Sequence, residues 1–145
     1  MKTLSIKQPY ASLIAEGFKD IENRTWKTNH RGKLLIHASA TYDKHPTGSI
    51  SGLLGAFRWS QLTNEFINKY NALPKSAIIG EVDLIDCIQG HDSLWADKWT
   101  QEDLWWFEDN NKKVPTIWHW VLENPVLYSE PILNVKGQLS VWNYG

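Results

Sequence analysis

The sequence has one cysteine, almost no net charge and no long apolar run. Because Cys87 is alone among 145 residues, an internal disulfide framework and a thiolate-rich metal site are excluded. No segment approaches the roughly 18 apolar residues of a transmembrane helix, and the N-terminus lacks the apolar stretch of a secretory signal. We therefore expect a cytoplasmic protein with no membrane partner, folded as one domain over residues 1–145.

Several catalytic and cofactor signatures are also missing. The five histidines show no H-x-x-x-H spacing, so we expect neither a metal nor a cofactor. There is no P-loop. The G-x-S-x-G elbow is absent, and Ser12 and Ser39 have no recognisable His or Asp partner, which disfavours a serine hydrolase.

The charge that is present is unevenly distributed. Residues 1–40 contain seven Lys or Arg and three Asp or Glu, whereas the rest of the chain contains eight and thirteen. A basic region on a nearly neutral protein fits an anionic ligand, such as a nucleotide or an RNA strand. The net charge of −1 argues against tight, non-specific duplex binding, which needs many phosphate contacts.

Apolar periodicity predicts strands at both ends of the chain. Residues 4–6, 20–26 and 33–38 have strand patterns, and a helix with Pro9 in its first turn is predicted between the first two. Residues 77–88 predict a long strand, in which Gly80 indicates a bulge or a close backbone approach.

The second half adds further strands and two helical insertions. Residues 116–122 and 126–135 predict two strands, which their prolines restrict to edges or bends, and a short strand closes the chain. The insertions lie at about 56–72 and 93–111, with one helix over 57–70 and a loop over 41–55. We expect the Trp cluster of the second insertion to anchor it to the strands. This α+β pattern predicts a small closed or half-closed β-barrel.

The N-terminal residues carry a family motif. The pattern L-S-[IV]-x-Q-P-[YW]-A-x-x-[IL]-x-x-G-x-K-x-x-E-x-R-x-W, followed by G-x-[LI]-x-I-H-A, resembles the ASCH family of the PUA-like superfamily. It is carried by Leu4, Ser5, Gln8, Pro9, Tyr10, Ala11, Ile14, Gly17, Lys19, Glu22, Arg24, Trp26, Gly32, Ile36, His37 and Ala38. The resemblance covers about the first quarter of the chain. It implies a PUA-like β-barrel with flanking helices, whose cleft binds RNA or nucleosides.

The first hypothesis is therefore an RNA- or nucleoside-binding domain with a basic cleft built from the first forty residues. We expect the basic side chains to contact phosphate, and Gln8 and Glu22 to read base edges. Tyr10 or Trp26 would stack on a base. The full set of candidate ligand-binding residues is Lys7, Gln8, Pro9, Tyr10, Lys19, Glu22, Arg24, Trp26, His37 and Glu81.

The resemblance also implies an enzyme as an alternative, a metal-independent amidohydrolase acting on an acylated nucleoside such as acetylated cytidine. That branch has Lys two residues after Gly, Thr three residues later and Arg two further on. Gly17, Lys19 and Arg24 match, but Glu22 occupies the Thr position. Glu22 would then act as general base on water while Lys19 and Arg24 stabilise the oxyanion. The later acidic member of that site is left open among Glu81, Glu102 and Asp103.

Two further interpretations remain. Glu22 and Arg24 share one face of a predicted strand, so with Lys19 they alternatively form only a structural ion-pair network. Residues 90–111 alternatively make the chain a protein-interaction module through their exposed Trp side chains.

Overall fold

The computed structural model describes residues 1–43 and 52–145 and is built on one mixed sheet. Its order is β2-β5-β4-β3-β1-β6. The strands are β1 (Lys2–Gln8), β2 (Ile21–Arg24), β3 (Gly32–Tyr42), β4 (Ala77–Ile88), β5 (Trp118–Ile132) and β6 (Val141–Asn143). Strands β1 and β3 are parallel, and every other neighbouring pair is antiparallel. The α+β class is confirmed, whereas no ladder joins β2 to β6 within the described residues, so a closed barrel is not.

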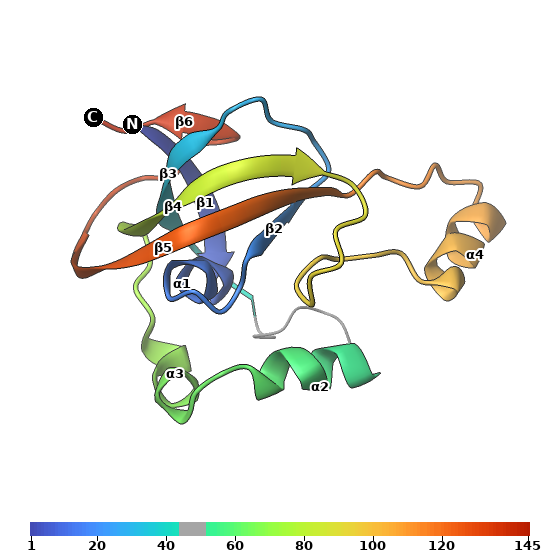
Figure 1. Ribbon diagram of the computed structural model, residues 1–145, viewed down its shortest axis with the longest axis horizontal. Coiled ribbons are helices and arrows are strands. Elements are labelled where there is room, and N and C mark those ends of the chain that lie inside the picture. Colours follow the sequence, from blue (N-terminus) through green and yellow to red (C-terminus); the bar gives the residue numbers. More distant parts are fainter. Residues whose placement is uncertain (44–51) are drawn as a thin grey trace.

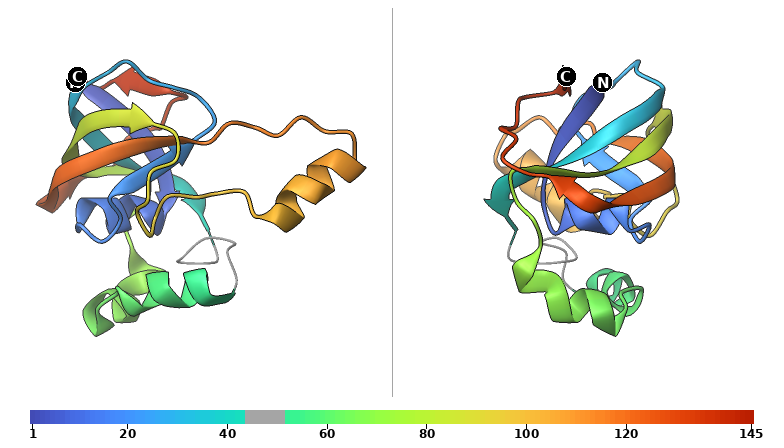
Figure 2. Two further views of the ribbon diagram at one scale, coloured as in Figure 1. Left: turned by 45° about the vertical axis from the view of Figure 1, so that its right-hand side comes forward. Right: turned by 90° about the vertical axis from the view of Figure 1, so that its left-hand side faces the viewer.

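Four helices accompany the sheet in the described residues. They are α1 (Tyr10–Ala15), α2 (Gly52–Ser60), α3 (Asn64–Lys69) and α4 (Gln101–Asp109), with a 3-10 turn, η1 (Tyr70–Ala72), after α3. Helix α1 lies against the sheet, α2 and α3 form a layer beyond it, and α4 stands away from the sheet on extended chain (Figures 1 and 2). None of these helices has the length and hydropathy needed to span a membrane.

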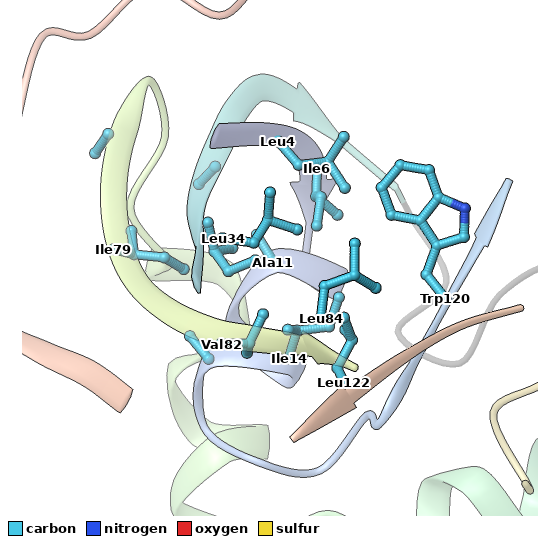
Figure 3. Close-up of a cluster of buried hydrophobic side chains, with 14 of the residues drawn as sticks. Leu4, Ile6, Ala11, Ile14, Leu34, Ile79, Val82, Leu84, Trp120 and Leu122 are labelled. Carbon is cyan, nitrogen blue, oxygen red and sulfur yellow. The ribbon is translucent and has the colours of Figure 1, made fainter. Parts of the chain in front are cut away.

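The core lies where α1 packs into the sheet. Ala11 and Ile14 of α1 are almost fully buried against Leu34, Leu84 and their neighbours from the strands. Figure 3 shows these side chains pointing toward one another from α1 and from the sheet. A second buried cluster forms around Phe66 of α3, so the α3 layer is held by apolar packing. The two clusters together fix α1 between the sheet and the helical layer.

The N-terminal prediction is confirmed with small changes of boundary. Strand β1 includes residues 4–6, and Pro9 occupies the cap position directly before α1. Gly17 has a φ of +89°, a left-handed conformation that only glycine adopts without strain, and it turns the chain after α1. The strand predicted over 20–26 is shorter, since β2 ends at Arg24.

The predicted pair of strands at 116–122 and 126–135 is wrong, because β5 is continuous from Trp118 to Ile132. Its pairing with β4 shifts register between the Glu81–Val126 and Asp83–Glu123 pairs, and Pro125 lies in that irregularity. A bulge leaves one residue out of the ladder, so a proline there costs no ladder hydrogen bond. Proline thus bends this strand without ending it.

The predicted helix over 57–70 is also wrong, because α2 ends at Ser60 and α3 begins at Asn64. Thr63 divides them: its side chain accepts a hydrogen bond from the backbone N–H of Phe66 and so starts a new helix. The loop predicted over 41–55 is too long, since β3 includes Tyr42 and α2 begins at Gly52. Residues 44–51 of that loop lie outside the described residues.

The Trp-rich insertion is anchored by one of its indoles. Trp95 is buried in the second cluster, as predicted, but Trp105 and Trp106 on α4 are 56% and 55% exposed. Thr100 and Asp103 form a capping box at the start of α4, with hydrogen bonds of 3.1 and 2.8 Å in the two directions. The prediction that the cluster anchors the insertion therefore holds for Trp95 and is wrong for the two indoles of α4.

The close approach predicted at Gly80 is confirmed. A Cβ atom at this position would lie 2.2 Å from the backbone oxygen of Val126 and 3.1 Å from the Cβ of Ala15. Only glycine therefore lets β4 pass between β5 and α1, because a side chain here would displace the backbone of β5 at Val126 or the core residue Ala15.

We expect Gly80→Ala to lower the free energy of unfolding by about 1–3 kcal/mol, because the added methyl forces β5 or α1 to shift. Denaturant titration followed by circular dichroism measures this change. The matched control is Ile85→Thr, which keeps a β-branched residue at an exposed position of the same strand and should change stability by less than about 0.5 kcal/mol. Equal stability of Gly80→Ala and wild type would contradict the close approach.

Candidate functional site

A pocket of about 600 Å³ opens where the end of β1, the start of α1 and strand β2 meet. Side chains of α2, of the segment before α4 and of the segment before β6 complete its wall. The lining residues are Ser5, Ile6, Lys7, Tyr10, Lys19, Glu22, Asn23, Arg24, Ser39, Asp43, Arg58, Trp95, Asp97, Gln138, Leu139 and Ser140. We call this cavity the Glu22 pocket.

Glu22 is a buried carboxylate in the wall of the pocket. Its Oε2 accepts hydrogen bonds from Nε and Nη2 of Arg24 at 3.0 and 2.8 Å. The two side chains meet because alternate residues of β2 point to the same side. Glu22 Oε1 accepts no hydrogen bond within the described residues, and the nearest cation, Lys19 Nζ, is 3.7 Å away. Every side-chain N or O atom that is fully enclosed in the described residues has a hydrogen-bond partner. Glu22 Oε1 has none, so it is not enclosed and is open to the pocket.

Lys19 is a buried cation beside this carboxylate. Its side chain is 6% exposed, and Nζ donates a hydrogen bond of 2.7 Å to the backbone oxygen of Ile21. Burial lowers the pKa of Lys19 below its ordinary value, because the charged form loses water; the charges of Glu22 and Asp97 oppose this shift. Lys19 thus loses its proton more readily than an exposed lysine.

Tyr10 forms another wall as the first residue of α1. Its hydroxyl donates a hydrogen bond of 3.0 Å to Asp43 Oδ2, and the Lys19 ammonium lies 5.7 Å from the ring centroid. Burial first, and then the Asp43 carboxylate, raise the pKa of Tyr10, since both oppose the phenolate. Tyr10 therefore presents a neutral aromatic ring to the pocket.

The wall formed by Arg58, Asn23 and Asp97 was not predicted from the sequence. Arg58 of α2 is 3% exposed, and it donates hydrogen bonds to Asp97 Oδ1 at 3.0 Å and to the Leu94 backbone oxygen at 2.8 Å. Asn23 of β2 donates to the Trp95 backbone oxygen at 3.0 Å and accepts from the Asp97 backbone N–H at 2.9 Å. These contacts join three segments far apart in sequence, so no local pattern could have shown that their side chains meet.

The structure brings together five of the predicted site residues and separates the other five. Lys7, Tyr10, Lys19, Glu22 and Arg24 all line the Glu22 pocket, whereas Gln8, Pro9, Trp26, His37 and Glu81 do not.

Two of the five residues outside the pocket, Gln8 and Trp26, make contacts that stabilise the fold. Gln8 is fully buried, and its amide binds Ser12 through both polar atoms and also the backbone oxygen of Pro74. It thereby fixes the turn at Pro9 that leads into α1. Trp26 packs its ring edge-on against Trp120, with centroids 4.7 Å apart, at the border of the core.

Glu81 and His37 take other partners. Glu81 accepts a hydrogen bond of 2.8 Å from the hydroxyl of Tyr128 and pairs with Lys33 at 3.2 Å. Burial and this carboxylate raise the pKa of Tyr128 to about 12. His37 is 1% exposed and lies between Ser5 and the backbone of Val135.

The pocket has mixed charge. Four basic and three acidic side chains line it, and two of the cations, Arg24 and Arg58, are hydrogen-bonded to carboxylates. Lys7 is exposed and has no ion-pair partner among the described residues. Within residues 1–43 and 52–145, no group of three or more His, Cys, Asp or Glu side chains is placed to hold a metal ion. Such a wall suits a ligand of low negative charge that carries several hydrogen-bonding groups.

Two curated relatives match this chain over part of their length. Activating signal cointegrator 1 of Mus musculus is 32% identical over 142 residues, which cover 96% of this chain and 21% of the cointegrator. Activating signal cointegrator 1 of Homo sapiens is 42% identical over 86 residues, covering 59% of this chain and 14% of the cointegrator. The chain thus corresponds to a small part of each of these relatives.

Solved structures of ASCH proteins share the fold. The crystal structure of ASCH from Zymomonas mobilis superposes with a TM-score of 0.53 at 16% identity, covering 91% of this chain and 72% of that one. A point variant of the same protein gives a TM-score of 0.50 at 15% identity, covering 92% and 73%. The family model of the ASCH domain matches residues 4–130 of the sequence. With most of its length inside that match and a mouse relative aligned over nearly all of it, the chain belongs to the ASCH domain family.

Proposed function

We propose that the Glu22 pocket binds one nucleotide unit, either free or within single-stranded RNA. The observation that carries this proposal is Glu22 Oε1, a carboxylate oxygen that is open to the pocket while Oε2 is held by Arg24. A carboxylate oxygen that faces the pocket and accepts no hydrogen bond among the described residues favours a ligand that donates an N–H, as the amino group of a nucleobase does.

The other walls of the pocket suit the remaining parts of a nucleotide. Its volume of about 600 Å³ is in the range of small-molecule sites. Tyr10 supplies a neutral ring on which a base can stack. Lys7 and Nη1 of Arg24, which has no hydrogen-bond partner among the described residues, supply donors for a phosphate. The mixed charge supports contact with one or two phosphates rather than with a long polyanion.

We expect saturable binding of nucleoside monophosphates or of a short single-stranded RNA, measured by isothermal titration calorimetry at several salt concentrations. Lys7→Ala should weaken RNA binding modestly and reduce the salt slope by about one unit, since it removes one phosphate contact. Lys113→Ala, an exposed lysine remote from the pocket, is the matched control.

A second control separates the pocket from the Trp-rich insertion. Replacing Gln101–Asp109 with a Gly-Ser linker of equal length should leave nucleotide affinity unchanged, because α4 does not line the pocket. Loss of nucleotide binding in this variant would instead indicate that α4 takes part in the nucleotide site, whereas the interaction hypothesis expects the pocket to stay functional without the insertion. Absence of binding to any nucleotide or RNA by the wild-type protein would reject the proposal.

The pKa of Lys19 makes a separate prediction about pH. Lys19 is protonated below its lowered pKa and attracts an anionic ligand, so affinity should fall as the pH rises through that pKa, before an exposed lysine would titrate. Cytidine monophosphate is the suitable probe, because neither cytosine nor its phosphate titrates in the alkaline range. This fall in affinity should be absent in Lys19→Gln and present in Lys7→Gln. A fall that remains in Lys19→Gln would belong to the titration of another group and would contradict the prediction.

The buried Lys19 also favours a second candidate function, hydrolysis of an acylated nucleoside. A lysine with a lowered pKa beside a carboxylate is an arrangement that acid–base chemistry uses, although Glu22 replaces the hydroxyl of the amidohydrolase branch.

If this reading holds, purified protein should deacetylate a member of a panel of acetylated nucleosides that includes acetylated cytidine, and both Lys19→Ala and Glu22→Gln should abolish turnover. Chromatographic loss of the acetylated species is the measurement, with Lys113→Ala as the active control. No turnover with any substrate, alongside saturable binding, would leave binding as the function of the pocket.

A further inference from the structure

A serine–histidine pair adjoins the Glu22 pocket, and neither of its two side chains takes part in the nucleotide proposal. Ser5 of β1 and His37 of β3 lie opposite each other in the parallel pair, and Ser5 Oγ is 2.9 Å from His37 Nδ1. His37 Nε2 is 2.7 Å from the backbone oxygen of Val135. Trp142 Nε1 lies 3.1 Å from Ser5 Oγ. Ser5 also lines the pocket.

The chemistry of these partners assigns every proton. A backbone oxygen only accepts, so Nε2 of a neutral His37 carries the hydrogen and Nδ1 is the acceptor. An indole N–H only donates, so Trp142 donates to Ser5 Oγ, and the Ser5 hydroxyl must direct its own hydrogen to His37 Nδ1. The result is a serine held against the basic nitrogen of a histidine, whose tautomer is set by the backbone of Val135.

From this geometry we propose that Ser5 is a nucleophile, activated by His37, that accepts the acyl group of a carboxylic ester. A nucleophile within hydrogen-bond distance of a base, with the base oriented by a third group, is the arrangement that covalent catalysis requires. The backbone oxygen of Val135 here orients the imidazole. His37 is 1% exposed, so water does not compete for Nδ1.

A cation lies beside the backbone of Ser5. Arg24 Nη2 donates a hydrogen bond of 3.0 Å to the backbone oxygen of Ser5, and Nη1 of the same guanidinium has no hydrogen-bond partner among the described residues. A guanidinium in this position can stabilise the oxyanion that develops when Ser5 adds to a carbonyl carbon.

The segment before β6 covers the pair. A Cβ at Gly137 would lie 2.8 Å from Ser5 Oγ and 2.9 Å from His37 Cε1, so only glycine lets the backbone approach this closely. The next residues of this segment, Gln138 and Leu139, line the pocket, so it both shields the pair and borders the space from which an ester would approach.

The reaction has two balanced halves. Ser5 Oγ adds to the ester carbonyl carbon as its proton moves to His37 Nδ1; the tetrahedral intermediate then expels the alcohol, which takes that proton, and leaves acyl-Ser5. Water next adds to the acyl carbon, giving a proton to His37 Nδ1; collapse breaks the bond to Ser5 Oγ, which recovers the proton, and releases the carboxylic acid. No oxidant, metal or cofactor enters either half.

A fluorophosphonate probe tests the nucleophile directly, because it phosphonylates an activated serine with loss of fluoride. We expect one adduct per chain in intact-mass spectrometry, with peptide mapping that places it on Ser5. The p-nitrophenyl ester of acetic acid should likewise transfer an acetyl group to Ser5 and release p-nitrophenol. Ser5→Ala should give no adduct, and His37→Gln should label at least about 100-fold more slowly, the usual contribution of a general base.

The exposed Ser129→Ala is the matched control and should label at the wild-type rate. An unlabelled wild-type protein, an adduct mapped to another residue, or an undiminished rate in His37→Gln would each overturn the proposal. Mapping on the wild-type chain decides the question even where a variant fails to fold. Since neither probe contains a nucleotide, the result is independent of whether the Glu22 pocket binds one.

Discussion

The packing of α1 against the sheet is the constraint on which the rest of the structure depends. This short helix contacts β1, β3, β4 and β5, and its Ala11, Leu13 and Ile14 are almost fully buried. Gly80 allows β4 to lie close enough to α1 and β5 for this packing. Tyr10, the first residue of α1, and Lys19, just beyond its end, both line the Glu22 pocket. The position of α1 therefore also sets the geometry of the site.

The pocket combines a buried carboxylate with buried cations, and this combination determines what it can do. Arg24 donates hydrogen bonds to one oxygen of Glu22, while the other oxygen faces the pocket and has only the Lys19 ammonium, 3.7 Å away, as its ion-pair partner. The same burial lowers the pKa of Lys19. The proposed recognition of a nucleotide and the proposed acid–base chemistry both use this pairing, since each needs a polar group that the fold has largely removed from water.

The sequence predicted the elements whose signals are local. The apolar runs of β1, β3 and β4 and the helix that follows Pro9 are all present. Predictions failed where a distant contact or a single side chain overrode the local pattern. The bulge of the β4–β5 pair accommodates Pro125 within one strand, and Thr63 caps a second helix inside a region with continuous helical spacing. Similarly, exposure of Trp105 could not be read from its type.

By itself, the sequence determined the family, the strand and helix pattern of the first forty residues, and five side chains of the pocket, because alternation along β2 and the ends of β1 and α1 are properties of neighbouring residues. Only the tertiary structure decided the rest. Arg58 and Asp97 reach the pocket through hydrogen bonds between segments far apart in the chain. Ser5 and His37 meet because β1 and β3 pair in parallel, and the register of that pair is set by the burial of the opposite faces of both strands against α1.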